Sequence, residues 1–103
     1  MEKDLLKIIN HYGVLKQLKY FYSEVYELTE AILKLENYDD ETYDFGSGRV
    51  DWTGWRRHIA EEIADCYVML EQFRHYYNIP DMTIDKIMHD KIKRQLERIE
   101  NEK

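Results

Sequence analysis

A chain of 103 residues with a formal net charge of −6 has room for one domain with a single modest core, which we place over residues 1–103. The acidic balance argues against a general nucleic-acid binder, which would carry a basic face, but it allows a phosphorylated ligand held through divalent cations. The one cysteine cannot form an internal disulfide, and the lack of both an apolar run of about 18 residues and a signal-peptide pattern predicts a cytoplasmic protein without membrane contact.

Helical periodicity begins near the N-terminus. A short amphipathic stretch from Asp4 to His11 ends before Gly13, and a longer stretch from Val14 to Glu36 repeats apolar residues at helical spacing. The apolar positions of the longer stretch are Leu18, Val25 and Ile32, with Phe21, Leu28 and Leu35 beside them. Residues 37–54 lose this period and gather Gly, Asp and Ser. We expect a loop there, and its length makes it a functional candidate.

Two further helices are expected in the second half of the chain. The first runs from Trp55 to Tyr77 and ends before Pro80, and the second begins with Asp81 or Thr83 as its cap. Their apolar stripes are Ile59, Ile63, Cys66, Leu70 and Phe73 in one, and Ile84, Met88, Ile92, Leu96 and Ile99 in the other. No strand-like alternation persists, so the predicted fold is all-α, with a short first helix and three long ones.

Two pairs of carboxylates stand in matching positions on the two central helices. Measured from the centre of each apolar stripe, Glu24 and Glu62 lie at about 100°, while Glu27 and Asp65 lie at about 160° on the same side. If the helices pack antiparallel, the four carboxylates converge at one level. Clustered carboxylates repel one another unless a cation lies among them, and their oxygens suit Mg²⁺ or Mn²⁺. The alternative is a solvated acidic surface, which is common on helices.

A family resemblance covers roughly residues 8–98. The stretch HYGVLKQLKYFYSEVYELTEAI followed by HIAEEIADCYVML resembles the MazG-type nucleoside triphosphate pyrophosphohydrolases of the all-α NTP pyrophosphatase group. Their Glu-x-x-Glu and Glu-x-x-Asp signature maps onto Glu24, Glu27, Glu62 and Asp65. The resemblance implies a four-helix MazG-like fold that assembles as an oligomeric helical bundle, with these carboxylates holding Mg²⁺ while an NTP is split into its monophosphate and pyrophosphate.

A polyphosphate substrate also requires cationic side chains. Lys91 and Arg94 lie on one side of the last helix and are the candidate phosphate ligands, although an ordinary charged helix surface explains them equally well. Lys16 and Lys19 are secondary candidates. Trp52 is a candidate substrate-binding residue because its ring can stack on a nucleobase, and the alternative is that it anchors the loop to a neighbouring subunit.

The predicted function is therefore a Mg²⁺-dependent NTP or dNTP pyrophosphohydrolase, with Mn²⁺ as a possible substitute. Glu24 or Glu27 is the candidate catalytic residue that orients or deprotonates the attacking water. Two alternatives are phosphoribosyl-ATP pyrophosphohydrolase and a non-catalytic helical regulatory dimer. We also expect a homo-oligomer, dimer or tetramer, because bulky residues such as Tyr20, Met69 and Met88 spread apolar surface beyond what one chain of this length covers.

Overall fold

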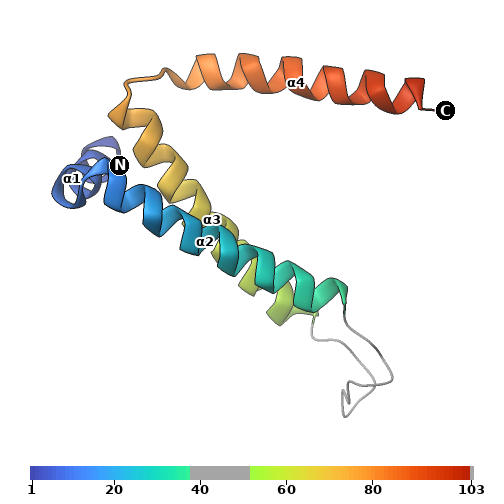
Figure 1. The fold of residues 1–103 in the computed structure, drawn as a ribbon, viewed down its shortest axis with the longest axis horizontal. Coiled ribbons are helices and arrows are strands. Elements are labelled where there is room, and N and C mark those ends of the chain that lie inside the picture. Colours follow the sequence, from blue (N-terminus) through green and yellow to red (C-terminus); the bar gives the residue numbers. More distant parts are fainter. Residues whose placement is uncertain (38–51, 103) are drawn as a thin grey trace, which may run out of the picture.

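The computed structural model describes residues 1–37 and 52–102, apart from the side chains of Trp52 and Thr53 (Figure 1). Its helices are α1 (Glu2–Tyr12), α2 (Val14–Glu36), α3 (Trp52–Tyr76) and α4 (Asp81–Asn101). No strand occurs in this part of the chain, which confirms the all-α prediction. The third helix begins at Trp52 instead of Trp55, so the end of the predicted loop is helical. Asn37 at the start of that loop is the C-cap of α2, and residues 38–51 lie outside the described residues. Within the described ranges, no helix is both long and apolar enough to span a bilayer.

Short turns with unusual backbone conformations separate α1 from α2 and α3 from α4. Gly13 has a φ of 92°, a value that residues with a Cβ rarely adopt. Its conformation allows α2 to start immediately after α1. Between α3 and α4, Asn78 adopts a left-handed φ of 54°, which asparagine tolerates better than most residues. Pro80 is the N-cap of α4, and no side chain caps that helix. The expected cap at Asp81 or Thr83 was therefore wrong, and Asp81 instead places its charge in the first turn, where the helix dipole favours it.

The first three helices form the packed part of the molecule. Helices α2 and α3 run side by side in opposite directions, and α1 lies across one end of the pair (Figure 1). Phe21 and Phe73 meet edge to face with ring centroids 5.8 Å apart, which bridges α2 and α3. The buried apolar residues of the described ranges are Leu5, Ile9, Ala31, Cys66 and Met69. Cys66 was expected in the core, and its burial is confirmed.

The buried line of α2 is not the predicted one. Leu18, Val25 and Ile32 are 39–42% exposed. The residues that α2 buries instead are Gln17, Glu24 and Ala31. Each precedes a predicted core position by one residue, so the buried face is turned by about 100°. The physical reason is that only two helices lie side by side here, and each buries the seam that faces its neighbour, so the centre of the apolar stripe stays uncovered.

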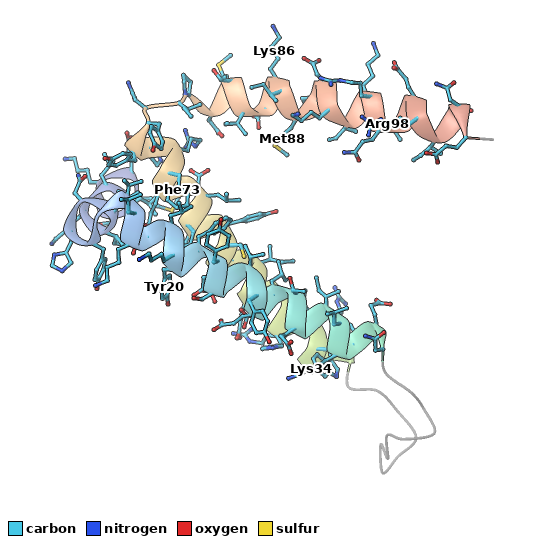
Figure 2. All side chains as sticks on the ribbon, viewed as in Figure 1. Tyr20, Lys34, Phe73, Lys86, Met88 and Arg98 are labelled. Atoms are coloured by element: carbon cyan, nitrogen blue, oxygen red, sulfur yellow. The ribbon has the colours of Figure 1, made fainter. Side chains whose placement is uncertain are left out.

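Helix α4 stands apart from the other three. It leaves the end of α3 and runs away from the helix pair, so that the pair and α4 form the two arms of a V (Figure 1). Met88 points into the opening and Lys86 points away from it (Figure 2), and α4 contains no buried residue. The radius of gyration is 18.3 Å, whereas a compact domain of this length has about 13 Å. One chain therefore does not cover the apolar stripe of α4.

A polar cluster fixes the end of α3. The Arg74 guanidinium donates hydrogen bonds to Glu71 at 2.8 Å and to the carbonyl oxygen of Ile79 at 3.0 Å, and it holds the pKa of the Glu71 carboxyl below its usual value. His75 Nδ1 lies 3.5 Å from a carboxylate oxygen of Glu2. These contacts tie α1 and the turn before α4 to the same end of α3.

Candidate metal centre

The structure brings together the four carboxylates that occupy equivalent helical positions in the sequence. Glu24 and Glu27 on α2, with Glu62 and Asp65 on α3, each offer one oxygen atom, and these four atoms lie within 4.8 Å of one another. The spacing of three residues puts both members of a pair on one side of a helix, and the antiparallel arrangement brings the two pairs to the same level. We call these four residues the carboxylate cluster.

The cluster is partly enclosed. Glu24 is only 6% exposed, while Glu27 and Asp65 are exposed and open the cluster to the surface. In the described part of the chain, Glu24 Oε2 and Glu62 Oε2 are both buried without a hydrogen-bond partner. A buried carboxylate oxygen without a partner is costly unless a positive charge offsets it.

Burial and mutual repulsion raise the pKa values of two carboxyl groups in the cluster. Burial is the largest cause that raises the pKa of Glu24, with further increases from Asp65, Glu27 and Glu62, while a hydrogen bond with the Tyr20 hydroxyl lowers it. Burial likewise raises the pKa of Glu62, and Glu27 raises it further. No described lysine or arginine forms an ion pair with any of the four carboxylates. The charge of His58 lowers the pKa of Glu62, but no lysine or arginine of the described ranges compensates the cluster.

This donor set fits a hard divalent cation. Four carboxylates on facing helices, two of them with enclosed oxygens that have no partner, are the ligands that Mg²⁺ and Mn²⁺ prefer. Cys66 lies nearby in the core, but burial raises the pKa of its thiol, as do the surrounding carboxylates. A thiol that stays protonated is a poor ligand, so a soft-metal site is not favoured.

Two grooves flank the cluster on the surface of the helix pair. The first, which we call the α1 groove, has a volume of about 720 Å³. Glu24 and Asp65 lie at its border with the cluster, and the residues that form its walls and floor include Ile8, Tyr12, Gln17, Tyr20, Met69 and Gln72. The second groove, of about 590 Å³, lies on the other side of the cluster and is lined by Trp55, His58 and Lys34 among others.

The remaining predicted site residues are placed differently. Lys91 and Arg94 are exposed on α4, and neither lines a groove beside the cluster, so one chain does not bring them to the carboxylates. Lys16 and Lys19 line the α1 groove. The side chain of Trp52 lies outside the described residues, so its predicted contact with substrate or with a neighbouring subunit stays a prediction.

The sequence analysis missed three polar residues near the cluster. Tyr20 lies one turn before Glu24, and the hydrogen bond between the two raises the pKa of its hydroxyl. Gln17 and Gln72 are buried, and Gln17 Nε2 donates a hydrogen bond of 2.8 Å to Gln72 Oε1. Their signal was present in the spacing, because each lies seven residues, about two turns, from a cluster carboxylate on its own helix.

Comparisons with known proteins do not identify a family. No model of a known protein family matches the chain, no curated protein matches it, and no solved structure matches it. The functional argument therefore depends on the residues and their geometry.

Proposed function

We propose that this chain is a cytoplasmic, Mg²⁺-dependent nucleotide pyrophosphohydrolase of the MazG-like type, which converts an NTP or dNTP to its monophosphate and pyrophosphate. The observation that carries the proposal is the cluster of four carboxylate oxygens within 4.8 Å, two of whose residues have enclosed oxygens without a partner. An acidic helix surface turned to solvent would not enclose them. The two grooves beside the cluster leave room for a substrate longer than the metal site itself.

The proposed ligands are Glu24, Glu27, Glu62 and Asp65. A divalent cation bound to them would lower the pKa of a coordinated water and neutralise charge on phosphate oxygens. Glu24 is buried, and a hydrogen bond with the Tyr20 hydroxyl lowers its pKa, which favours the ionised form that a ligand requires. Glu27 is exposed at the open side of the cluster, so its carboxylate is better placed to take a proton from the attacking water.

Metal binding and hydrolysis can be tested separately. Unfolding temperature should rise with Mg²⁺ or Mn²⁺, by an amount that corresponds to about 2.7 kcal/mol when the free metal is at 100 times its dissociation constant. The metal-loaded protein should release pyrophosphate from at least one canonical or modified NTP, whereas EDTA-treated protein should not. A protein that neither cation stabilises, and that releases no pyrophosphate, would contradict the proposal. Phosphoribosyl-ATP as a parallel substrate tests the related alternative.

The proposed assembly is a homodimer. The chain exposes 8889 Å², whereas a compact monomer of 12.7 kDa exposes about 6,200 Å². The excess, about 2,700 Å², exceeds the roughly 800 Å² that each partner contributes to a stable interface. The apolar stripe of α4 and the Val25 side of α2 are both exposed on every copy. We propose a two-fold dimer in which each copy covers these surfaces of the other, the simplest closed assembly of two identical chains.

The second candidate function is a non-catalytic helical interaction module. It is favoured by the uncovered stripe of α4, which in this alternative would bind a partner while the carboxylates remain surface charges. This alternative predicts assembly without any metal effect on unfolding. The nucleotide hydrolase predicts both, so the metal titration distinguishes the two functions.

A further inference from the structure

The α1 groove has the chemical character of a site for a planar organic group. Its volume of about 720 Å³ falls within the roughly 300–1,000 Å³ that small-molecule sites occupy. Tyr12 and Tyr20 supply aromatic surface, and Ile8, Val68 and Met69 supply apolar surface. Lys16 lies at the rim, with its Nζ 5.4 Å from the centroid of the Tyr12 ring, so that part of its charge is already engaged by an aromatic face.

The buried Gln17–Gln72 pair gives this groove hydrogen-bonding groups. Gln17 Nε2 donates to Gln72 Oε1 at 2.8 Å, and Gln72 Nε2 approaches Met69 Sδ at 3.8 Å. Each amide has two N–H donors and one carbonyl acceptor, so these contacts leave Gln17 Oε1 and one N–H of each amide unused. Neither amide has an enclosed atom without a partner among residues 1–37 and 52–102. Because both residues line the groove, we infer that their unused groups are accessible from it.

The position of the groove fixes its relation to the carboxylate cluster. Glu24 and Asp65 belong both to the cluster and to the groove lining, and the amide pair lies about two turns further along both helices. A ligand that reaches from the cluster into the groove would therefore have its anionic end at the cluster and its uncharged end at the amides. A phosphate group at the amide end of the groove would lie about two turns from the proposed cation, which is the group that would neutralise its charge.

We propose that the α1 groove binds the nucleobase of the substrate, with Gln17 and Gln72 as the residues that read the base edge and determine specificity. The assignment rests on the proposed nucleotide pyrophosphohydrolase function. A glutamine amide has a carbonyl acceptor beside its N–H donors, so it can form two hydrogen bonds with a base edge that presents a donor beside an acceptor. The phosphates extend from the groove toward the cluster. Lys19, which lies between Gln17 and Glu24 on α2, is beside the ribose or the first phosphate, whereas Lys16 lies at the Tyr12 end of the groove.

Methionine methyl groups provide a direct binding test that does not require turnover. Met69 lines the groove, and Met88 lies on α4, away from it (Figure 2). In protein with ¹³C-labelled methionine methyl groups and Mg²⁺, non-hydrolysable α,β-imido analogues of ATP, GTP, CTP and UTP should shift the Met69 signal for at least one base. The Met88 signal should not move, and inorganic tripolyphosphate should leave Met69 unchanged. An unmoved Met69 signal with all four analogues, or an equal shift with tripolyphosphate, would overturn the assignment.

Two sets of variants test the residues. Val68→Trp fills the groove from a position that is 45% exposed and should weaken analogue binding at least 10-fold while it retains metal stabilisation. Ala64→Trp is the matched control, because Ala64 is exposed on the same helix and lines neither groove. The double variant Gln17→Met/Gln72→Met replaces both partners of the hydrogen bond, so neither amide is left unpaired. It should reduce the preference between the best and worst base at least 10-fold.

The outcomes separate this inference from the proposed function. If Mn²⁺ stabilises the protein and an NTP is hydrolysed, but Val68→Trp and the double glutamine variant bind and discriminate as the wild type does, the groove assignment fails and the hydrolase proposal stands. If neither Mg²⁺ nor Mn²⁺ changes the unfolding temperature, the metal site fails first. A Met69 shift with a nucleotide analogue would then still place the base in the groove.

Discussion

The carboxylate of Glu24 on α2 and that of Asp65 on α3 approach within 4.8 Å across the helix pair. About two turns away on the same helices, Gln17 and Gln72 meet across the same seam with a hydrogen bond of 2.8 Å. The two amides can bond to each other without an ion, because an amide both donates and accepts. Two ionised carboxylates can only accept, so they require a cation or a proton between them. This contrast on one seam is the physical basis for the metal proposal and for the predictions below.

Removal of one cluster charge should abolish metal binding. Glu27→Gln and Asp65→Asn keep the size of each side chain but delete an anionic ligand, so metal-induced stabilisation should disappear. Pyrophosphate release should fall by more than about 100-fold, beyond what loss of a merely supporting partner costs. Unfolding curves with and without Mn²⁺, together with a pyrophosphate assay, measure both effects.

Glu61→Gln is the matched control for these variants. Glu61 is adjacent to the cluster residue Glu62 in sequence but forms an exposed ion pair with Arg57 at 3.2 Å. Exposed pairs of this kind contribute little to stability, so metal stabilisation and turnover should stay near the wild-type values. Wild-type turnover by Asp65→Asn would remove the metal-site assignment.

The metal-free protein should lose stability relative to Glu24→Gln as pH rises. The folded state raises the pKa of Glu24 above its ordinary value of 4.5, so between the ordinary and the raised pKa the folded state holds more protons than the unfolded state. Stability then falls as pH rises through this window. Gln cannot ionise, so the difference in unfolding temperature between Glu24→Gln and wild type should grow in favour of the variant.

The same experiment with Mn²⁺ supplies the control for that pH effect. Metal binds the ionised carboxylate, so protons compete with it and metal stabilisation of the wild type should increase with pH. In EDTA the wild type should show the opposite slope relative to Glu24→Gln. If the difference in unfolding temperature between the two proteins is constant with pH, the folded state does not raise the pKa of Glu24.

Lys91 and Arg94 give a prediction that separates metal binding from substrate binding. Both are exposed on α4. Neither lines a groove beside the carboxylate cluster of its own chain. Lys91→Ala/Arg94→Ala should therefore leave metal-induced stabilisation unchanged. Any rise in KM for the nucleotide would place these residues at the site of a second copy. Loss of the metal effect in this variant would contradict the separation of α4 from the cluster.

Much of this fold could be predicted from residue periodicity. The four helices follow from apolar spacing and from Gly13 and Pro80, since these features are local. The convergence of Glu24, Glu27, Glu62 and Asp65 followed from equal helical phase, because two antiparallel helices with matched acidic sides have few other ways to pack.

The sequence did not reveal which face of each helix is buried, because this depends on the surface that packs against it. The apolar stripe through Leu18 and Val25 was expected in the core, yet the chain buries Gln17 and Glu24 instead. Periodicity reports that a surface is apolar, but it does not report whether its partner belongs to the same chain. The polar residues at Gln17 and Gln72 were overlooked for the same reason, since a buried amide pair is recognisable only when both helices are placed together.

Disruption of the α4 stripe should convert the proposed dimer into a monomer. Ile92 is 52% exposed in the single chain, so Ile92→Glu should change the stability of the monomer by no more than about 0.5 kcal/mol. In the dimer the new carboxylates would be buried without partners, at a cost of at least about 3 kcal/mol, which weakens association more than 100-fold. Lys93→Glu is the control, because it introduces a carboxylate one residue away and off the stripe, with a larger change in net charge than Ile92→Glu. Sedimentation at micromolar concentration should show twice 12.7 kDa for the wild type and for Lys93→Glu, and a single chain for Ile92→Glu. A wild-type protein that sediments as a single chain, or an Ile92→Glu variant that still sediments as a dimer, would show that the α4 stripe is not the interface.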